Sequence, residues 1–264
     1  MFQILIIIIT FSILIILHEL GHFLMARKFG VRVEEFGLGL PPRLWGKKIG
    51  ETLFSLNAIP FGGFVRMFGE EENIKESQSF SGKPIWQRAL IVVAGVVVFW
   101  IIAFILLSVV LGLGALVAVG DGEVVGAYSW YQAPIKGFLV TGSLTRSIVE
   151  GFGQIIGLAI QGEPMPAGVK VLGPVGIFDF MGDRLDMGMV YFLHFIAIIV
   201  IHLAIINLLP IPALDGGKLV FLGIEAIRGK PISQKVEQNI TAFFFLLLIS
   251  LMIFITIQDI GRIF

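Results

Sequence analysis

Long apolar runs separated by short polar segments dominate this chain. Four of the runs carry almost no charge and are long enough for helices that cross a hydrocarbon core, which takes roughly 20 residues. They run over residues 2–26, 89–113, 187–209 and 239–258. The pattern therefore predicts four transmembrane helices.

Between the first two spans the pattern changes from continuous to alternating. Residues 28–85 are too polar to cross, and the runs 52–56 and 64–67 alternate apolar and polar positions on either side of Gly62 and Gly63. Such alternation favours short β-strands. An open strand edge cannot face lipid, so we expect these strands to contact protein or to pair with a further extended strand. The predicted fold class is a membrane protein, mainly α, with four transmembrane helices and a small membrane-associated β region after the first.

The order of these segments predicts three parts. Residues 1–113 form the N-terminal half of a core, 114–186 a Gly-rich outer segment, and 187–264 the C-terminal half. Within the outer segment, 151–162 is uncharged but too short to cross, which is typical of a segment at the interface. The first 17 residues lack a basic leader and a small-residue cleavage site, so we expect a retained helix rather than a cleaved signal.

Composition narrows the class of protein. Hydrophobic residues make up 56% of the 264 positions and charged residues only 14%, which argues against a soluble globular domain. The 19 basic and 19 acidic residues balance, so nothing points to nucleic acid as a partner. The chain has no cysteine, which excludes disulfides, thiol catalysis and Cys-ligated zinc. Any bound metal must use nitrogen and oxygen ligands.

The distribution of basic residues predicts the orientation. Ten of the 19 Lys and Arg residues lie between Arg27 and Arg88, and the positive-inside rule places that loop in the cytoplasm. With four alternating spans, both termini then lie outside, and spans 1 and 3 both end at the cytoplasmic face. His22, in the first span, and Asp215, after the third, are therefore expected at a similar depth.

Ionisable residues at the inner end of the first span are costly there and usually functional. The sequence His18-Glu19-Leu20-Gly21-His22 fits the pattern H-E-x-x-H. A spacing of four places both imidazoles on one helical face to bind zinc, and Glu19 beside them is suited to activate a water molecule. In the alternative interpretation, these residues end a helix and hydrogen-bond lipid headgroups and water. The position of the motif at the end of an apolar span favours the metal-binding interpretation.

A catalytic zinc normally has three protein ligands, so a third ligand is expected. The candidates are His194, His202, Asp215 and Glu225. The two histidines lie within the third span, where a packed, hydrogen-bonded histidine is the more common finding. Asp215 follows two prolines that end a helix and precedes two glycines that allow a tight backbone. It could instead cap a helix over 218–228, but its expected depth favours the ligand role.

The two motifs together resemble those of the site-2 protease family of intramembrane metalloproteases, closest to its bacterial RseP-like branch. The family signatures are HELGH near the N-terminus and NLLPIPALDGG near the C-terminus, and both match here without a gap. The resemblance implies a zinc site of His18, His22 and Asp215, with Glu19 as the catalytic base. It also implies that Asn207 helps to hold the substrate strand.

Two further segments resemble the family. Residues 61–66 are similar to its membrane-associated β region, whose edge is thought to pair with unwound substrate. This implies substrate-binding roles for Gly62, Gly63 and Phe64. Residues 173–177 resemble the stretch that precedes the family's third core span.

The sequence departs from the family in two places. Relatives carry one or two PDZ domains between the second and third spans, whereas here residues 120–123 lead directly into 124–127. We therefore interpret 114–186 as a shortened extracytoplasmic segment without a PDZ domain. Relatives often read AGPxxN where this chain has residues 94–99, so a polar contact at position 99 is expected to be missing.

The function that the resemblance implies is hydrolysis of peptide bonds within or near transmembrane segments, such as those of anti-sigma factors or remnant signal peptides. The expected cofactor is Zn²⁺, and the expected partners are single-span transmembrane substrates and membrane lipid. The expected location is the bacterial inner membrane, with both termini extracytoplasmic and the active site towards the cytoplasm.

Two rival interpretations remain open at this point. A transporter or a non-proteolytic metal-binding membrane protein would also carry intramembrane ionisable residues, but it predicts inverted repeats, which this sequence lacks. An inactive relative could bind transmembrane segments without cleaving them. The intact Glu19 argues against that rival, because a binding-only protein needs no base beside the metal.

Overall fold

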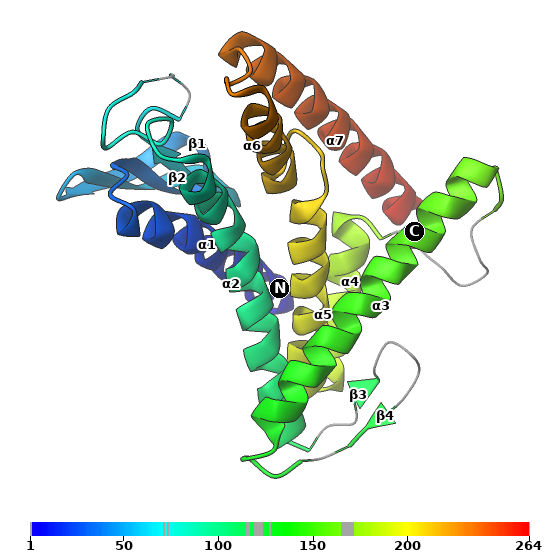
Figure 1. Cartoon of the computed structure of the whole chain (residues 1–264). Helices are drawn as coiled ribbons and strands as arrows, with labels where there is room; N and C mark the ends of the chain where they lie inside the picture. The colour runs from blue at the N-terminus through cyan, green and yellow to red at the C-terminus, as the bar shows by residue number, and fades with distance from the viewer. Residues whose placement is uncertain are drawn as a thin grey trace. The chain divides into compact units, whose positions relative to one another are not determined.

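The computed structural model describes residues 2–70, 72, 74–114, 117–118, 124–126, 128–164 and 172–263. Helices and strands alternate in the first half of the chain, and helices fill the second (Figure 1). In chain order the elements are α1 (Phe2–Lys28), β1 (Val33–Ile49), β2 (Thr52–Met67), α2 (Ile85–Gly112), β3 (Val117–Ala118), β4 (Val124–Val125), α3 (Ala133–Gln161), α4 (Pro174–Met187), α5 (Met189–Leu208), α6 (Asp215–Arg228) and α7 (Gln234–Ile263).

Four helices in the described part of the chain are long and apolar enough to cross a membrane, namely α1, α2, α5 and α7. This confirms the four predicted spans, although α2 and α7 begin several residues earlier than predicted. The early start of α2 brings Arg88 into the helix, where its guanidinium pairs with the carboxylate of Glu225. A charged residue ends a span in a hydropathy pattern, but a helix continues through it when the charge has a partner.

The described part of residues 114–186 contains two helices that the sequence pattern did not predict, α3 and α4. Five glycines lie inside α3. Because glycine is a poor helix former, helix propensity does not predict this helix. The structure explains why one of these glycines is needed. A Cβ at Gly137 would lie 2.2 Å from the Oγ of Ser108 in α2, too close for any side chain. Close packing therefore stabilises α3 where intrinsic propensity does not. Residues 120–123, at the expected deletion, lie outside the described residues.

The chain divides into two compact units. One comprises residues 1–99 with 206–247, and the other comprises 100–205 with 248–264. The HELGH motif, the β region, Asn207 and Asp215 all belong to the first unit. The site can therefore be described within that unit alone.

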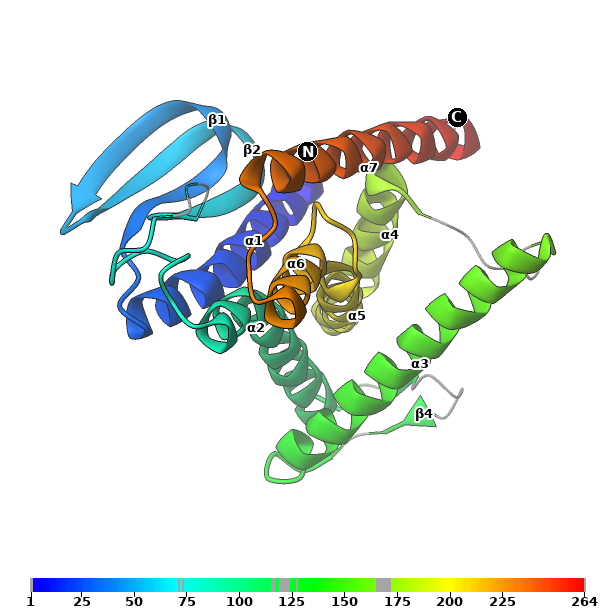
Figure 2. The same ribbon diagram turned by 45° about the horizontal axis from the view of Figure 1, so that its top comes forward.

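In the first unit, β1 and β2 form a bent sheet beside α1 (Figures 1 and 2). Residues 35–38 have partners on both sides, 53–56 and 63–66, so the sheet is three strands wide at that point. The sequence prediction of a small β region after the first helix is confirmed. Gly62 has φ +111°, a conformation that other residues rarely adopt, and it marks a bend within β2 just before 63–66.

A buried apolar cluster holds the sheet against the helices of this unit. Its members come from the end of α1, both strands, α2 and α6, and include Phe23, Phe36, Met67, Ile91 and Leu222. The rings of Phe23 and Phe36 meet edge to face with centroids 5.5 Å apart. This cluster fixes the relative positions of the elements that carry the candidate site residues.

Candidate metal centre

The two histidines of the HELGH motif lie one turn apart on α1 and are both buried. Their Nε2 atoms are 3.2 Å apart. The Nδ1 atom of His22 lies 2.8 Å from the carbonyl oxygen of Ile91 in α2. Because a carbonyl only accepts hydrogen bonds, Nδ1 carries the proton, and Nε2 is left with a lone pair that points toward His18.

Glycine at position 95 lets α2 approach the two imidazoles. A Cβ there would lie 2.5 Å from both the Cε1 of His18 and the Nε2 of His22, closer than real Cβ contacts. Gly21 in α1 serves the same close approach, since a Cβ on it would lie 2.6 Å from the carbonyl oxygen of Ala94. The site therefore depends on two small residues on facing helices.

Asp215 reaches the histidines from the other end of the sequence. Its Oδ2 lies 3.3 Å from the Nε2 of His18 and 3.5 Å from the Nε2 of His22. The glycines that follow it are required for space, because a Cβ at Gly216 or Gly217 would lie 2.2 to 2.3 Å from carbonyl oxygens of the preceding turn.

The structure also answers the alternative that Asp215 caps a helix over 218–228. Helix α6 begins at Asp215 itself, with Leu214 as its N-cap. The Asp215 carboxylate lies toward the imidazoles, as the distances above show. Asp215 is therefore the first residue of the helix rather than its cap.

The three donor atoms have the spacing of a metal site. Ligands 2.0–2.1 Å from a tetrahedral zinc lie about 3.3–3.4 Å from one another, and the observed separations are 3.2, 3.3 and 3.5 Å. The Oδ2 of Asp215 is also buried without a hydrogen-bond donor. Within the described part of the chain, His18, His22 and Asp215 are the one group of such residues that could hold a metal. This donor set fits zinc.

Asp215 is ionised at neutral pH. Burial by itself would raise the pKa of its carboxyl group, but the close imidazoles of His18 and His22 outweigh burial and lower the pKa to about 2. A carboxylate in this state is ready to bind a cation without first losing a proton.

Glu19 lies between the histidines and the edge segment of the sheet. The backbone of Val65 hydrogen-bonds its carboxylate, and a Cβ at Gly63 would lie 3.1 Å from its Cγ. Residues 63–66 thus run directly past Glu19. The ring of Phe64 covers Gly37, where a Cβ would lie 2.4 Å from it.

Position 99, where relatives often carry a polar residue, is a phenylalanine here. Phe99 is buried, and its ring stacks on the imidazole of His18 with centroids 4.5 Å apart. The Nδ1 of His18 is buried without a hydrogen-bond partner. An aromatic contact with Phe99 therefore orients the imidazole of His18, whereas a hydrogen bond to the Ile91 carbonyl orients that of His22.

The remaining candidates do not join the three donor atoms. His194 and His202 belong to the second unit, and the Nδ1 of His202 bonds the carbonyl oxygen of Ile198. Glu225 pairs with Arg88 through both carboxylate oxygens. Asn207 is half-buried in the last turn of α5, eight residues before Asp215, and its role toward substrate stays a prediction.

Sequence reasoning did not assign roles to Ile91, Gly95 and Phe99. Gly95 and Phe99 lie in the AGPxxN-like segment, where Gly95 keeps the residue of the pattern and Phe99 departs from it, and Ile91 precedes the segment. Contacts between helices that lie 70 residues apart in the chain cannot be read from one sequence. The structure adds these three residues of α2 to the site.

The fold and the site define a helical membrane protein with a buried His₂Asp centre beside a glutamate. Comparisons with known proteins agree. The profile of peptidase family M50 matches residues 6–251. A Clostridium perfringens protein described as a candidate zinc metalloprotease is 31% identical over 95% of this chain and 96% of its own length. The regulator of sigma-W protease RasP of Bacillus subtilis is 25% identical over 97% of this chain and 98% of its own length.

The chain belongs to peptidase family M50. The predicted class, a zinc metalloprotease of the membrane, is thereby confirmed, and the transporter interpretation is not supported. The alignments run over 325 and 419 positions, more than the 264 residues of this chain, so both relatives carry insertions that it lacks.

Proposed function

We propose that this chain cleaves single-span membrane proteins within the membrane, with zinc held by His18, His22 and Asp215 and with Glu19 as the general base. The observation that carries this proposal is the convergence of three donor atoms at 3.2 to 3.5 Å, with a carboxylate on the same helical turn. When bound, zinc supplies Lewis acidity toward the scissile carbonyl and toward water.

The protein residues supply the remaining chemistry. Glu19 accepts a proton from the attacking water and returns it to the leaving amide nitrogen. The hydrogen bond from the Val65 backbone holds its carboxylate in place. The carbonyl of Ile91 fixes the tautomer of His22, so that Nε2 would be free to bind the metal.

A transmembrane helix shields its peptide bonds, so cleavage requires local unwinding. The freed N–H and C=O groups then need new partners in a site without bulk water. The segment 63–66 has a strand partner at 35–38 on one side and passes Glu19. Strand addition to this segment would satisfy the substrate backbone and bring its carbonyl to the metal. Gly62, Gly63 and Phe64 would line this position, and Asn207 would hold the opposite side of the substrate strand.

The charge pattern and the relatives support a proposed location and substrate class. We place the chain in the inner membrane with its termini outside and its site near the cytoplasmic face, on the positive-inside rule. One relative is named as a regulator of sigma-W, which supports anti-sigma factors as substrates; remnant signal peptides fit the same chemistry. The insertions in the relatives support the interpretation of 114–186 as a segment without a PDZ domain.

The test uses the full chain purified in lipid vesicles with a single-span substrate. The wild type should cleave it, and a zinc chelator should stop cleavage until zinc is restored. Glu19→Gln should lower kcat by about 10²- to 10⁴-fold, as expected for loss of a general base, while it keeps its zinc. Glu150→Gln is the matched control, because Glu150 lies exposed on α3 in the second unit.

Each outcome is informative. Cleavage by Glu19→Gln at the wild-type rate, with zinc bound, would exclude the proposed base. Cleavage that survives complete removal of metal would exclude the zinc mechanism. Ion transport that Glu19→Gln leaves unchanged, without cleavage, would favour a transporter.

A further inference from the structure

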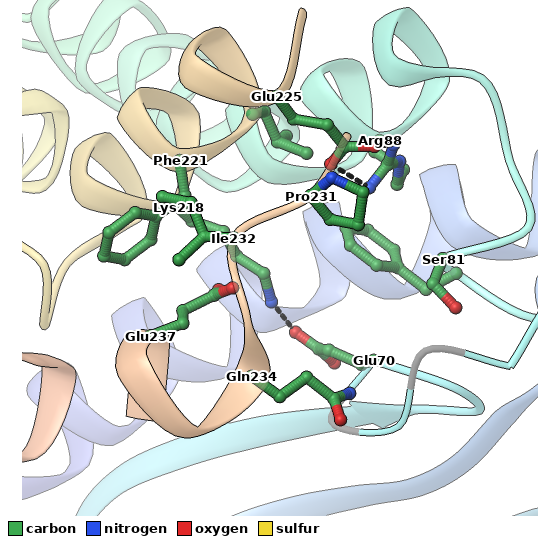
Figure 3. Close-up of a pocket in the computed structure, with 12 residues that line it drawn as sticks. Glu70, Ser81, Arg88, Lys218, Phe221, Glu225, Pro231, Ile232, Gln234 and Glu237 are labelled. Atoms are coloured by element: carbon green, nitrogen blue, oxygen red, sulfur yellow. Dashed lines mark hydrogen bonds and ion pairs between the residues drawn. The ribbon is translucent and has the colours of Figure 1, made fainter. Parts of the chain in front are cut away.

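A group of charged side chains lies around a small cavity in the first unit, apart from the zinc ligands (Figure 3). It is built from the loop after β2, the start of α2, one face of α6 and the start of α7. Two ion pairs cross it: Lys218 with Glu70, and Arg88 with Glu225. The proposed chemistry uses none of these four residues.

Glu70 makes two contacts that connect different elements. One carboxylate oxygen, Oε1, pairs with the ammonium of Lys218 in α6. The other, Oε2, accepts a hydrogen bond of 3.3 Å from the backbone N–H of Met67, the last residue of β2. A single side chain therefore joins the end of the edge segment to helix α6.

The side chain of Lys218 is fixed by its place in α6 and by a contact with Phe80. It lies three residues after Asp215, on the next turn of the same helix, and its ammonium lies 4.9 Å from the centre of the Phe80 ring. Burial lowers the pKa of Lys218 to about 8, with Glu237 opposing the shift, so the ammonium is mostly charged at neutral pH. The pairing with Glu70 is therefore ionic under ordinary conditions.

The second ion pair fixes the same helix further along. Arg88 donates to both oxygens of Glu225 at 2.9 and 2.5 Å, and its side chain is only 9% exposed. A bidentate pair of this kind sets orientation as well as distance. Helix α6 is thus attached to α2 at one point and to the end of β2 at another.

We propose that Glu70 and Lys218 are positioning residues for catalysis: their ion pair sets the position of the substrate-pairing segment 63–67 relative to Asp215. This inference rests on the proposed function, in which the substrate strand pairs with that segment while Asp215 holds the metal. The two binding elements are far apart in sequence, and Glu70 bonds one of them while Lys218 belongs to the other. A shift between them would misplace the scissile carbonyl even with both elements intact.

The kinetic test compares Glu70→Gln, Lys218→Met and the double variant in the full chain. A misplacement on the order of 1 Å costs up to about 10²-fold in rate, so each single variant should lower kcat ten- to a hundredfold. KM should stay within about twofold, and zinc content should match the wild type. The double variant should be no slower than the worse single variant, because both remove one interaction. Lys218→Arg keeps the charge and should retain most of the rate.

A second measurement needs no activity. Amide hydrogen exchange should become about three- to tenfold faster in peptides covering 63–70 when Lys218 is changed to Met, although Lys218 lies in another element. The matched control is the pair Arg146 and Glu150 on α3, whose side chains are 80% and 54% exposed. Arg146→Gln should change neither the exchange of 63–70 nor kcat.

The outcomes separate this inference from the proposed function. Unchanged exchange at 63–70 in Lys218→Met, or additive losses in the double variant, would overturn the positioning role. If the wild type does not cleave at all, the proposed function fails, and the exchange result still decides whether the two elements are coupled. If Glu19→Gln abolishes cleavage while Glu70→Gln cleaves like wild type, only the positioning role is wrong.

Discussion

The substitution Gly95→Ala tests the packing of the metal site most directly. The added methyl would lie 2.5 Å from the Cε1 of His18 and from the Nε2 of His22. Ordinary van der Waals contact needs 3.4 to 4 Å, so helix α2 or the imidazoles must move by about 1 Å. Overpacking of this size typically costs about 1–3 kcal/mol of stability.

The effect on the metal should exceed the effect on folding. Zinc sites tolerate ligand displacements of only about 0.2 Å, so a shift near 1 Å removes one histidine from ideal geometry. The same movement lengthens the bond between His22 and the carbonyl of Ile91, and loss of such an outer contact typically costs about 10- to 100-fold in metal affinity. We expect at least that loss in Gly95→Ala, with cleavage falling in proportion to bound zinc.

Zinc affinity would be measured by competition with a chelator of known affinity, and stability by thermal unfolding of the same samples. Gly142→Ala is the matched control, because Gly142 also lies in a helix, and a Cβ there would meet nothing within 4 Å. That change should leave zinc binding unaltered and stabilise the helix by up to about 1 kcal/mol. Wild-type zinc affinity in Gly95→Ala would refute the close approach of α2 to the two imidazoles.

Three further predictions follow from individual contacts. Phe99→Asn should tighten zinc binding severalfold in a chelator titration, because the amide oxygen could accept a hydrogen bond from the Nδ1–H of His18, which has no partner now. Weaker zinc binding would show that the ring stacking contributes more than this hydrogen bond. Arg88→Met should destabilise the protein by about 1–3 kcal/mol, since it leaves the partly buried Glu225 carboxylate, 16% exposed, without its partner. Adding Glu225→Leu should recover part of the loss in thermal unfolding. Asp259→Leu should lower the free energy of unfolding by about 0.5–2 kcal/mol, because the buried Asp259 carboxylate accepts a hydrogen bond of 2.8 Å from the backbone N–H of Gly176 at the start of α4. An unchanged thermal unfolding curve would argue against this cap.

The Asp259 contact also explains a sequence feature that resemblance alone left without a reason. Residues 173–177 contain two glycines, and a Cβ at either Gly173 or Gly176 would lie within about 3 Å of the Asp259 carboxylate. The glycines leave room for an acidic side chain from the other end of the second unit. Chain proximity gives no hint of this partner, 83 residues away.

The sequence by itself determined the features that depend on local chemistry. Apolar runs of sufficient length must be helices in a membrane, because no other local structure satisfies every backbone group there, so α1, α2, α5 and α7 were predictable. The spacing of His18 and His22 places both imidazoles on one helical face, where they could bind one metal ion. Alternation after α1 predicted the strands that became β1 and β2, although not their length.

Only the tertiary structure decided which distant groups meet. The sequence left four candidates for a third ligand, and the structure brings the Oδ2 of one of them, Asp215, to 3.3 Å from the Nε2 of His18. The roles of Gly95 and Phe99, and the connection that Glu70 makes to α6, depend on how helices far apart in the chain pack together. Packing depends on the shapes of both partners at once, whereas a sequence pattern reports the preference of one segment at a time.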